Sequence, residues 1–378
     1  MAVRNVALER FLAASKDFLP PIAESVTNRV TSHGHRDGVR RYTAQELASI
    51  AQKHSQQVSK SSGGASSSDR PPSGAVRAGA GNRPWWVGKT LEILNEFGHE
   101  EVSTVMWASV RMRYKEQRTS RNNFHGQLIE HVTQMPETLP PKRISQFILA
   151  CAHLGVNPQT AVPLANRVLC ANGLYDLDGR GVANLVWSLS KMHTPLQLAV
   201  PICERVLEIA ICQSESILSG AVHQRAWAAG ELVTVVWALQ KLSFLSVRRQ
   251  GHEVVSSLAK AVCALVEREG DAVQMMSFSN GLHAFVSAGC DEREVLPLAK
   301  MLPGDPEQRK VSSADLASVA WAVAKCNIVD EVVMRKLFNF VSVLHGRGQL
   351  SSQALAVATW AVGERVRELF DRVSKFLI

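Results

Sequence analysis

One short motif centred on tryptophan recurs along this 378-residue chain and constrains the fold more than any other feature. Two further segments fit the same frame with Leu149 or His283 at the tryptophan position, which we call the slot, and successive slots are separated by 38 to 50 residues. A repeat of this length is typical of stacked helical hairpins, so the sequence predicts an all-α solenoid with a period of about 38–50 residues. The complete copies are VMWASVRM at Trp107, ISQFILACAHL at Leu149, LVWSLSKM at Trp187, VVWALQKL at Trp237, FSNGLHAFVSA at His283, VAWAVAKC at Trp321 and ATWAVGER at Trp360.

The positions around the slot indicate a helix that is covered on most sides. The residue after the slot is always Ala or Ser, and the residue five before it is always apolar. Since an α-helix advances by about 100° per residue, these positions lie on different sides of one helix, and the small residue allows a neighbouring helix to come close. The apolar set is Val102, Ile144, Val182, Leu232, Phe278, Leu316 and Leu355.

A narrow polar stripe interrupts this apolar surface. It consists of the residue three before the slot and the residue four after it, which lie seven apart and therefore on one face of the helix. We call this stripe the polar ladder and predict that it binds RNA, through cations to phosphates and through polar groups to base edges. An ordinary solvated face is the alternative interpretation. The predicted RNA-binding residues are Thr104, Arg111, Gln146, His153, Asn184, Lys191, Thr234, Lys241, Asn280, Ser318 and Lys325; Ser287, Val357 and Glu364 stand at the equivalent positions of less regular copies.

Between the motif helices lie segments that we expect to form partner helices. Each has an apolar period near 3.6 and a single cation in its middle, and Gly and Pro mark the joints between helices. The segments are PLANRVL with Arg167, PICERVLEI with Arg205, SLAKAVCALV with Lys260, PLAKML with Lys300 and MRKLFNFV with Lys336.

Composition along the chain predicts three parts. Residues 1–58 form a helical segment with one weak motif copy, ELASIAQKH around Gln52, and residues 59–84, rich in Ser, Gly and Pro, form a flexible linker or insertion. Residues 85–378 form the repeat array, which ends in an incomplete unit. We expect another protein, or RNA, to cover the apolar end that this unit leaves open.

Charge and residue usage narrow the class of function. A net charge of +8 favours polyanionic partners. No apolar stretch approaches the roughly 18 uninterrupted residues of a membrane-spanning helix, so we expect no membrane insertion. The seven cysteines lie singly without CxxC pairs, and neither the Walker and GxGxxG signatures nor GxSxG and HExxH occur. The sequence therefore predicts no metal, no cofactor and no enzymatic activity.

The motif of an apolar residue, a small residue, a polar residue, two apolar residues and then Trp-Ala-x-x-Lys resembles the octotricopeptide repeat and the related repeats of FAST-kinase-like and RAP-domain proteins. The resemblance covers about three quarters of the chain but includes no separate RAP domain after Trp360. It implies a non-catalytic RNA-binding α-solenoid of a mitochondrion, or alternatively a plastid. Such a protein would bind ribosomal RNA as a component of the mitochondrial ribosome, or act in RNA maturation or stability. A protein scaffold inside a large organellar complex is the alternative function.

Three smaller features have competing interpretations. We interpret the slot tryptophans as wedges between hairpins, with base stacking as the alternative. The pair Trp85 and Trp86 is expected to begin the first full helix rather than to clamp RNA. The sequence HGH at 33–35 is interpreted as a solvated basic loop, because two histidines alone do not complete a metal site.

Overall fold

The computed structural model describes residues 42–62, 84–112, 114, 124–135, 139–170, 173–221, 227–247, 251–304, 311–361 and 363. Every regular element in these residues is a helix, which confirms the predicted all-α class. The chain divides into two compact units, residues 1–132 and 133–378. Residues 63–83 of the predicted linker, the HGH sequence at 33–35 and residues 364–378 lie outside the described residues.

Unit 1 is built around a long helix that carries the weak motif copy. This helix, α2 (Ala44–Ser62), packs along α4 (His99–Arg111) and also contacts α3 (Trp85–Glu92); a 3-10 turn at Leu94–Glu96 and helix α5 (Phe124–Gln134) complete the described elements. Leu47 and Ala51 of the weak copy are fully buried. The first motif copy thus packs against the next one, as the repeat pattern predicts.

The tryptophan pair at the start of α3 has two different environments. Trp86 is fully buried; its indole N–H donates to His54 Nδ1 over 3.4 Å, and its ring meets the edge of Phe124 at 5.9 Å between centroids. Trp85 is 54% exposed and lies 5.6 Å from the ring of Tyr42. Helix α3 does begin at Trp85, but only Trp86 belongs to the core of unit 1.

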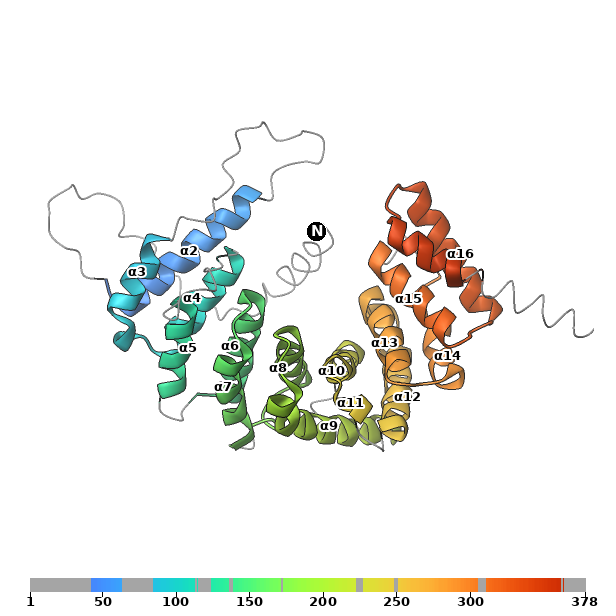
Figure 1. The fold of residues 1–378 in the computed structure, drawn as a ribbon, viewed down its shortest axis with the longest axis horizontal. Helices are drawn as coiled ribbons and strands as arrows, with labels where there is room; N and C mark the ends of the chain where they lie inside the picture. Colours follow the sequence, from blue (N-terminus) through green and yellow to red (C-terminus); the bar gives the residue numbers. More distant parts are fainter. Residues whose placement is uncertain are drawn as a thin grey trace, which may run out of the picture. The chain divides into compact units, whose positions relative to one another are not determined.

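Unit 2 consists of two rows of helices. The first row holds the motif helices, each packed against the next, and the second row holds the partner helices, packed in the same order (Figure 1). In Figure 1 the first row lies on the inner side of the bend that this unit makes. The first row is α6 (Pro141–Leu154), α8 (Gly179–Lys191), α10 (Ala229–Lys241), α13 (Met275–Ser287) and α15 (Ser313–Lys325); the second is α7 (Pro158–Cys170), α9 (Leu196–Leu218), α12 (Gly251–Glu269), α14 (Glu292–Lys300) and α16 (Glu331–Gly346).

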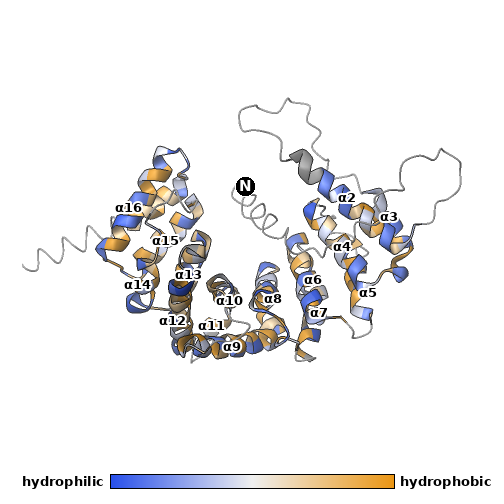
Figure 2. Cartoon of the chain, turned by 180° about the vertical axis from the view of Figure 1, so that it is seen from behind, coloured by the Kyte–Doolittle hydropathy of each residue, from blue (hydrophilic) through white to orange (hydrophobic). Residues whose placement is uncertain are grey.

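Smaller elements complete the unit. The four-residue α11 (Phe244–Val247) and a 3-10 turn at Gly270–Ala272 flank α12. Residues 352–361, which contain the motif copy at Trp360, are also helical. Figure 2 shows hydrophobic and hydrophilic residues alternating along the helices of both rows, which is the pattern of helices buried on some sides only. Within the described residues, no helix combines the length and the apolar character needed to cross a membrane.

Side-chain caps fix where several helices begin. Asp178 Oδ1 accepts a hydrogen bond from the Gly181 amide at 2.7 Å, and Asp330 Oδ1 accepts from the Val332 amide at 3.0 Å. Asp291 and Ser312 form capping boxes with Glu294 and Asp315. These caps satisfy amide groups that have no partner inside their own helix, and each typically contributes about 1 kcal/mol.

The motif helices end in one common way. The residue six after the slot has a positive φ in every described copy of unit 2. In the copies at Leu149, Trp187, His283 and Trp321 the amide one position later donates back to the carbonyl two after the slot, as from Thr194 to Leu189 over 3.1 Å. This is the Schellman arrangement, which favours Gly because other side chains are strained there. The residues are Gly155 (φ 72°), His193 (55°), Ser243 (60°), Gly289 (98°) and Asn327 (61°).

The core follows the motif alignment closely. Every residue just after the slot is at most 2% exposed, and the apolar residue five before the slot is at most 3% exposed in six copies. The exception is Leu355, 43% exposed, in the last described helix. A Cβ on Gly281 would lie 3.2 Å from Val233 Cγ2, which shows how closely α13 and α10 approach.

Second-row helices begin earlier than the proline-led sequence segments suggest. Pro163, Pro201 and Pro297 lie inside α7, α9 and α14, each at the sixth position of its helix. Proline lacks the amide that would donate to the residue four before it, so each helix loses one hydrogen bond in its second turn.

Cysteine thiols belong largely to this core. Cys151, Cys203, Cys263 and Cys290 are buried free thiols, and burial raises the pKa of Cys203 to about 12 and that of Cys263 to about 11. These thiols therefore stay protonated at neutral pH and pack as small apolar groups.

Candidate nucleic-acid interface

The polar ladder is the partly exposed stripe of the motif helices. The residue three before the slot is half-buried in every copy, whereas the two residues before the slot and the residue after it are buried in the copies at Trp107, Trp187, Trp237, His283 and Trp321. The inner first-row helices α8, α10 and α13 have neighbours on both sides within their row and the second row behind them. The ladder is therefore the side that these neighbours leave uncovered, while Thr104 and Arg111 lie on the corresponding stripe of α4 in unit 1.

The cations of the ladder differ in exposure. Lys191, Lys241 and Lys325 are exposed, whereas Arg111 and His153 are half-buried. Burial lowers the pKa of Arg111, but its guanidinium stays charged at neutral pH. All five stand in the last turn of their helices, where the positive charges of the lysines and of Arg111 also stabilise the C-terminal end of the helix dipole. Helix stability alone thus explains part of the recurrence of cations four after the slot.

The polar positions of the ladder fall into two groups. The hydroxyl groups of Thr104 and Thr234 donate to the carbonyls of Glu100 and Gly230, over 2.8 and 2.7 Å, so each retains only the ability to accept. Gln146 Oε1 accepts from Arg143 Nη1 at 3.4 Å. Within the part of the chain that the structure describes, Asn184, Asn280 and Ser318 have no side-chain hydrogen bond. These three can therefore both donate and accept toward a ligand.

Aromatic rings from the slots lie along the same stripe. Trp107, Trp187, Trp237 and Trp321 are half-buried rather than fully enclosed, and Trp360 is 44% exposed. The ring of His153 lies 5.3 Å from that of Trp187, and the ring of His283 lies 4.6 Å from that of Trp321, both measured between centroids. Each pair joins successive motif helices. The slot residues thus combine packing between repeats with a partly open ring at the ladder.

His283 shows how close the ladder cations come to these rings. Its pKa is lowered, first by burial and then by the positive charge of Lys241 on the preceding motif helix. His283 is consequently neutral at physiological pH, and its ring acts as an aromatic surface rather than as a cation.

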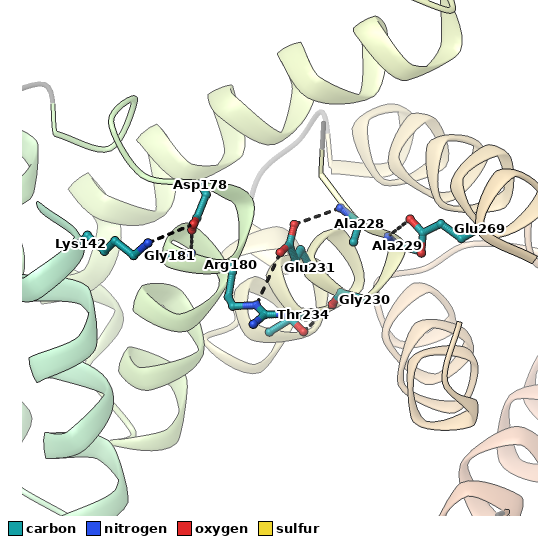
Figure 3. Close-up of polar contacts among 10 residues, drawn as sticks. All are labelled: Lys142, Asp178, Arg180, Gly181, Ala228, Ala229, Gly230, Glu231, Thr234 and Glu269. Atoms are coloured by element: carbon teal, nitrogen blue, oxygen red, sulfur yellow. Dashed lines mark hydrogen bonds and ion pairs between the residues drawn. The ribbon is translucent and has the colours of Figure 1, made fainter. Parts of the chain in front are cut away.

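A second polar feature runs along the N-terminal ends of the motif helices, and Figure 3 shows its centre. Lys142 lies 3.8 Å from the carboxylate of Asp178, and Arg180 lies 3.9 Å from Glu231. The Glu231 carboxylate also accepts from the Ala228 amide at 3.0 Å, and burial raises its pKa. Further along the row, Ser279 Oγ donates to Asp315 Oδ1 at 2.8 Å in a buried setting.

We call these residues the N-terminal edge network. Its ion pairs Lys142–Asp178 and Arg180–Glu231 and the Ser279–Asp315 hydrogen bond each join one repeat to the next, so the network fixes the stacking of motif helices rather than offering groups to a ligand. Motif alignment missed this network because the partner carboxylates stand at different offsets from the slot, nine before it at Asp178 and six before it at Glu231. Acidic residues at a helix start or in its first turn were the available signal.

The cations of the partner helices also have structural partners. Arg167 donates to the carbonyls of Thr133 and Met135, the latter over 3.0 Å. Lys336 Nζ donates to the carbonyls of Lys300 and Leu302 over 2.6 and 2.7 Å, at the end of the preceding partner helix. These side chains close the C-terminal ends of neighbouring helices, whose carbonyls would otherwise lack a partner. The second row is thereby a weaker candidate for phosphate binding than the first.

Other sites in the described residues are less suited to a specific ligand. A groove of about 540 Å³ between α12 and α14 is lined by charges of both signs, among them Lys260, Glu267, Arg293 and Glu294. No group of three or more His, Cys, Asp or Glu side chains in the described ranges could hold a metal ion. The ladder is therefore the strongest candidate interface.

Comparisons with known proteins assign no family. No protein-family model matches the chain, and no curated protein is similar to it.

Proposed function

We propose that the chain is a non-catalytic RNA-binding helical-repeat protein, in which the polar ladder follows an RNA backbone. The observation that supports this most is the recurrence of exposed Lys191, Lys241 and Lys325 at one position of three motif helices. Each has a polar group on the same stripe: Asn184 and Ser318 can donate and accept, and Thr234 can accept. Repeated cations on one face match the repeated charge of a polynucleotide. The net charge of the whole chain, +8, is also positive and so favours binding to a polyanion.

The identity of the RNA and the location in the cell follow from the sequence resemblance alone. They are an organellar ribosomal RNA or transcript, in a mitochondrion or else a plastid. The role would be that of a mitochondrial ribosome component or of a factor in RNA maturation or stability.

A protein scaffold is the second candidate function. It is favoured by the exposed apolar side chains Phe338, Leu355 and Trp360 at the C-terminal end of the described array, which are 51%, 43% and 44% exposed. All three lie in the last two described helices, and apolar surface exposed to solvent is typical of protein contacts. In this scheme the ladder would hold an acidic peptide or subunit instead of RNA.

RNA affinity measured at two salt concentrations separates these functions. We expect full-length protein to bind RNA at low salt and to weaken steeply as salt rises, because phosphate binding releases counterions. A variant in which Gln replaces all four of Arg111, Lys191, Lys241 and Lys325 should show RNA affinity that depends less steeply on salt concentration. Absence of RNA binding at low salt would refute the RNA-binding proposal.

The second row offers a matched control for the loss of charge. Lys260 of α12 and Arg335 of α16 are exposed cations of that row. Replacing this pair removes as much charge as replacing Lys191 and Lys241. We expect the ladder pair to lower the slope of log affinity against log salt by about 1.4, at about 0.7 for each single-strand phosphate contact, and the control pair to leave it nearly unchanged.

A further inference from the structure

The rungs of the ladder in unit 2 are not equivalent, because some slot rings are paired with a second ring and the ring of Trp237 is not. Trp187 is paired with His153 of the preceding motif helix, and Trp321 is paired with His283. Centroid separations of 5.3 and 4.6 Å, with ring planes tilted by 38° and 33°, are those of favourable offset aromatic pairs. One side of each of these indoles is therefore covered by the protein itself.

Trp237 lies between these two rungs and is different. Across the described part of the chain, its indole makes no ring contact, no cation–π contact and no hydrogen bond, although the side chain is only half-buried. The residue equivalent to His153 on the preceding motif helix is Lys191, which is exposed. A lysine thus replaces the imidazole that covers the indole in the neighbouring rung.

The helix spacing and the equivalence of repeats place cations and a hydrogen-bond acceptor on the same stripe as this indole. Lys241 stands one turn beyond Trp237 on α10 and is exposed; Thr234 stands one turn before it, with its hydroxyl proton already donated to Gly230. By the equivalence of repeats, Lys191 lies on the side of α8. An aromatic surface between two cations matches the chemistry of a nucleotide, whose base stacks while adjoining phosphates bind the cations.

We propose that Trp237 is a base-stacking subsite for one unpaired nucleotide, with Lys191 and Lys241 holding the phosphates on either side. The inference rests on the proposed function and goes further, because it requires a single strand. Bases in a duplex are stacked on each other, so their faces are closed to an indole. The subsite also predicts that one slot ring contributes to affinity far more than its neighbours.

The test compares three RNA probes with full-length protein in fluorescence-anisotropy titrations: a single-stranded oligonucleotide, the same strand in a duplex, and an abasic oligonucleotide of equal length. The variants are Trp237→Leu, Trp237→Phe and, as a matched control, Trp187→Leu. Thermal unfolding of each variant shows whether it folds, and the phenylalanine variant retains a stacking ring where the leucine variant does not.

We expect Trp237→Leu to weaken binding of the single strand about tenfold or more, the usual effect of losing one stacked base, and to leave abasic binding unchanged. Trp237→Phe should stay within about threefold of the unmodified protein, since phenylalanine also stacks. Binding of the single strand should quench tryptophan emission in the unmodified protein, and the part of the quenching due to Trp237 should be lost in Trp237→Leu.

Several outcomes would overturn the inference. Equal loss of affinity in Trp187→Leu, unchanged binding by Trp237→Leu, or equal affinity for duplex and single strand each contradict an open stacking subsite while leaving salt-dependent RNA binding intact. Absence of any RNA binding, together with tight binding of a polyglutamate peptide, would instead refute the proposed RNA-binding function and, with it, the stacking subsite.

Discussion

The positive φ of the residue six after each slot leads to a stability prediction, which a substitution to Gly and a substitution from Gly can both test. Ser243 has φ 60° and is exposed, and its side chain makes no hydrogen bond within the described residues. Replacing Ser243 with Gly removes about 1–2 kcal/mol of backbone strain from the folded state. It also stabilises the unfolded state by about 0.5–1 kcal/mol, because glycine gives the unfolded chain more conformational entropy. We expect a net gain of about 0.5–1 kcal/mol in the free energy of unfolding.

The opposite substitution should have the opposite sign. Gly289 occupies the equivalent position of the next repeat with φ 98°, and a Cβ there would meet no atom within 4 Å. Gly289→Ala is therefore expected to lose about 0.5–1 kcal/mol through backbone strain alone. Gly346 is the control: it ends α16, has no positive φ, and also has open space around a Cβ. There the same Gly→Ala change should stabilise the protein or leave it unaffected.

Urea unfolding followed by far-UV circular dichroism measures these differences, provided that the slopes of the transitions agree between variants. In a solenoid the effect of one substitution is local to its repeat and its neighbours, so the two changes should add when combined. Destabilisation by Ser243→Gly, or the same sign for Gly289→Ala and Gly346→Ala, would refute the assignment of a strained helix end at this position.

Two further predictions concern the core. His125 is 5% exposed, its Nε2 has no hydrogen bond in the described residues, and burial lowers its pKa from 6.5 to about 4. Below pH 6.5 the unfolded chain takes up a proton at this histidine that the folded chain does not. The free energy of unfolding is therefore highest above pH 6.5 and falls by up to about 3 kcal/mol as the pH drops toward 4. The variant His125→Leu should lose this part of the acid sensitivity, as measured by urea midpoints across that pH range, and an unchanged pH profile would contradict the assignment. Ala238 is fully buried directly after its slot, so Ala238→Leu should overpack the contact between motif helices and cost about 1–3 kcal/mol, whereas an unchanged urea midpoint would show that the helices do not approach closely there.

The helical repeats could be predicted from the sequence because the motif recurs at fixed offsets from the slot. Val182, Leu232 and Ala238 are buried because the same helix face meets the same neighbours in each repeat. The helix ends could also have been found by extending the alignment one turn further. The residue six after the slot is Gly, His, Ser, Gly and Asn in unit 2, and three of these five are residue types that readily adopt a positive φ, while His does so more often than most.

Contacts between repeats could not be predicted in the same way. The pairs Lys142–Asp178 and Arg180–Glu231 join residues 36 and 51 positions apart. Both cations stand seven before their slots, but the carboxylates stand nine and six before theirs. The ring contacts of the slot residues depend on the neighbouring repeat as well, since His153 lies beside Trp187 whereas Lys191 stands at the equivalent position before Trp237. A single aligned motif contains no information on these pairings.

The most direct measurement of the central claim is the position of RNA on the protein. Full-length protein would be crosslinked by ultraviolet light to single-stranded RNA that contains thiouridine, and the modified peptides would be identified by mass spectrometry. We predict crosslinks in the first-row helices, above all in residues 229–241 around Trp237. Crosslinks confined to the second-row helices α9, α12 and α16 would contradict the assignment of the polar ladder as the RNA-binding surface.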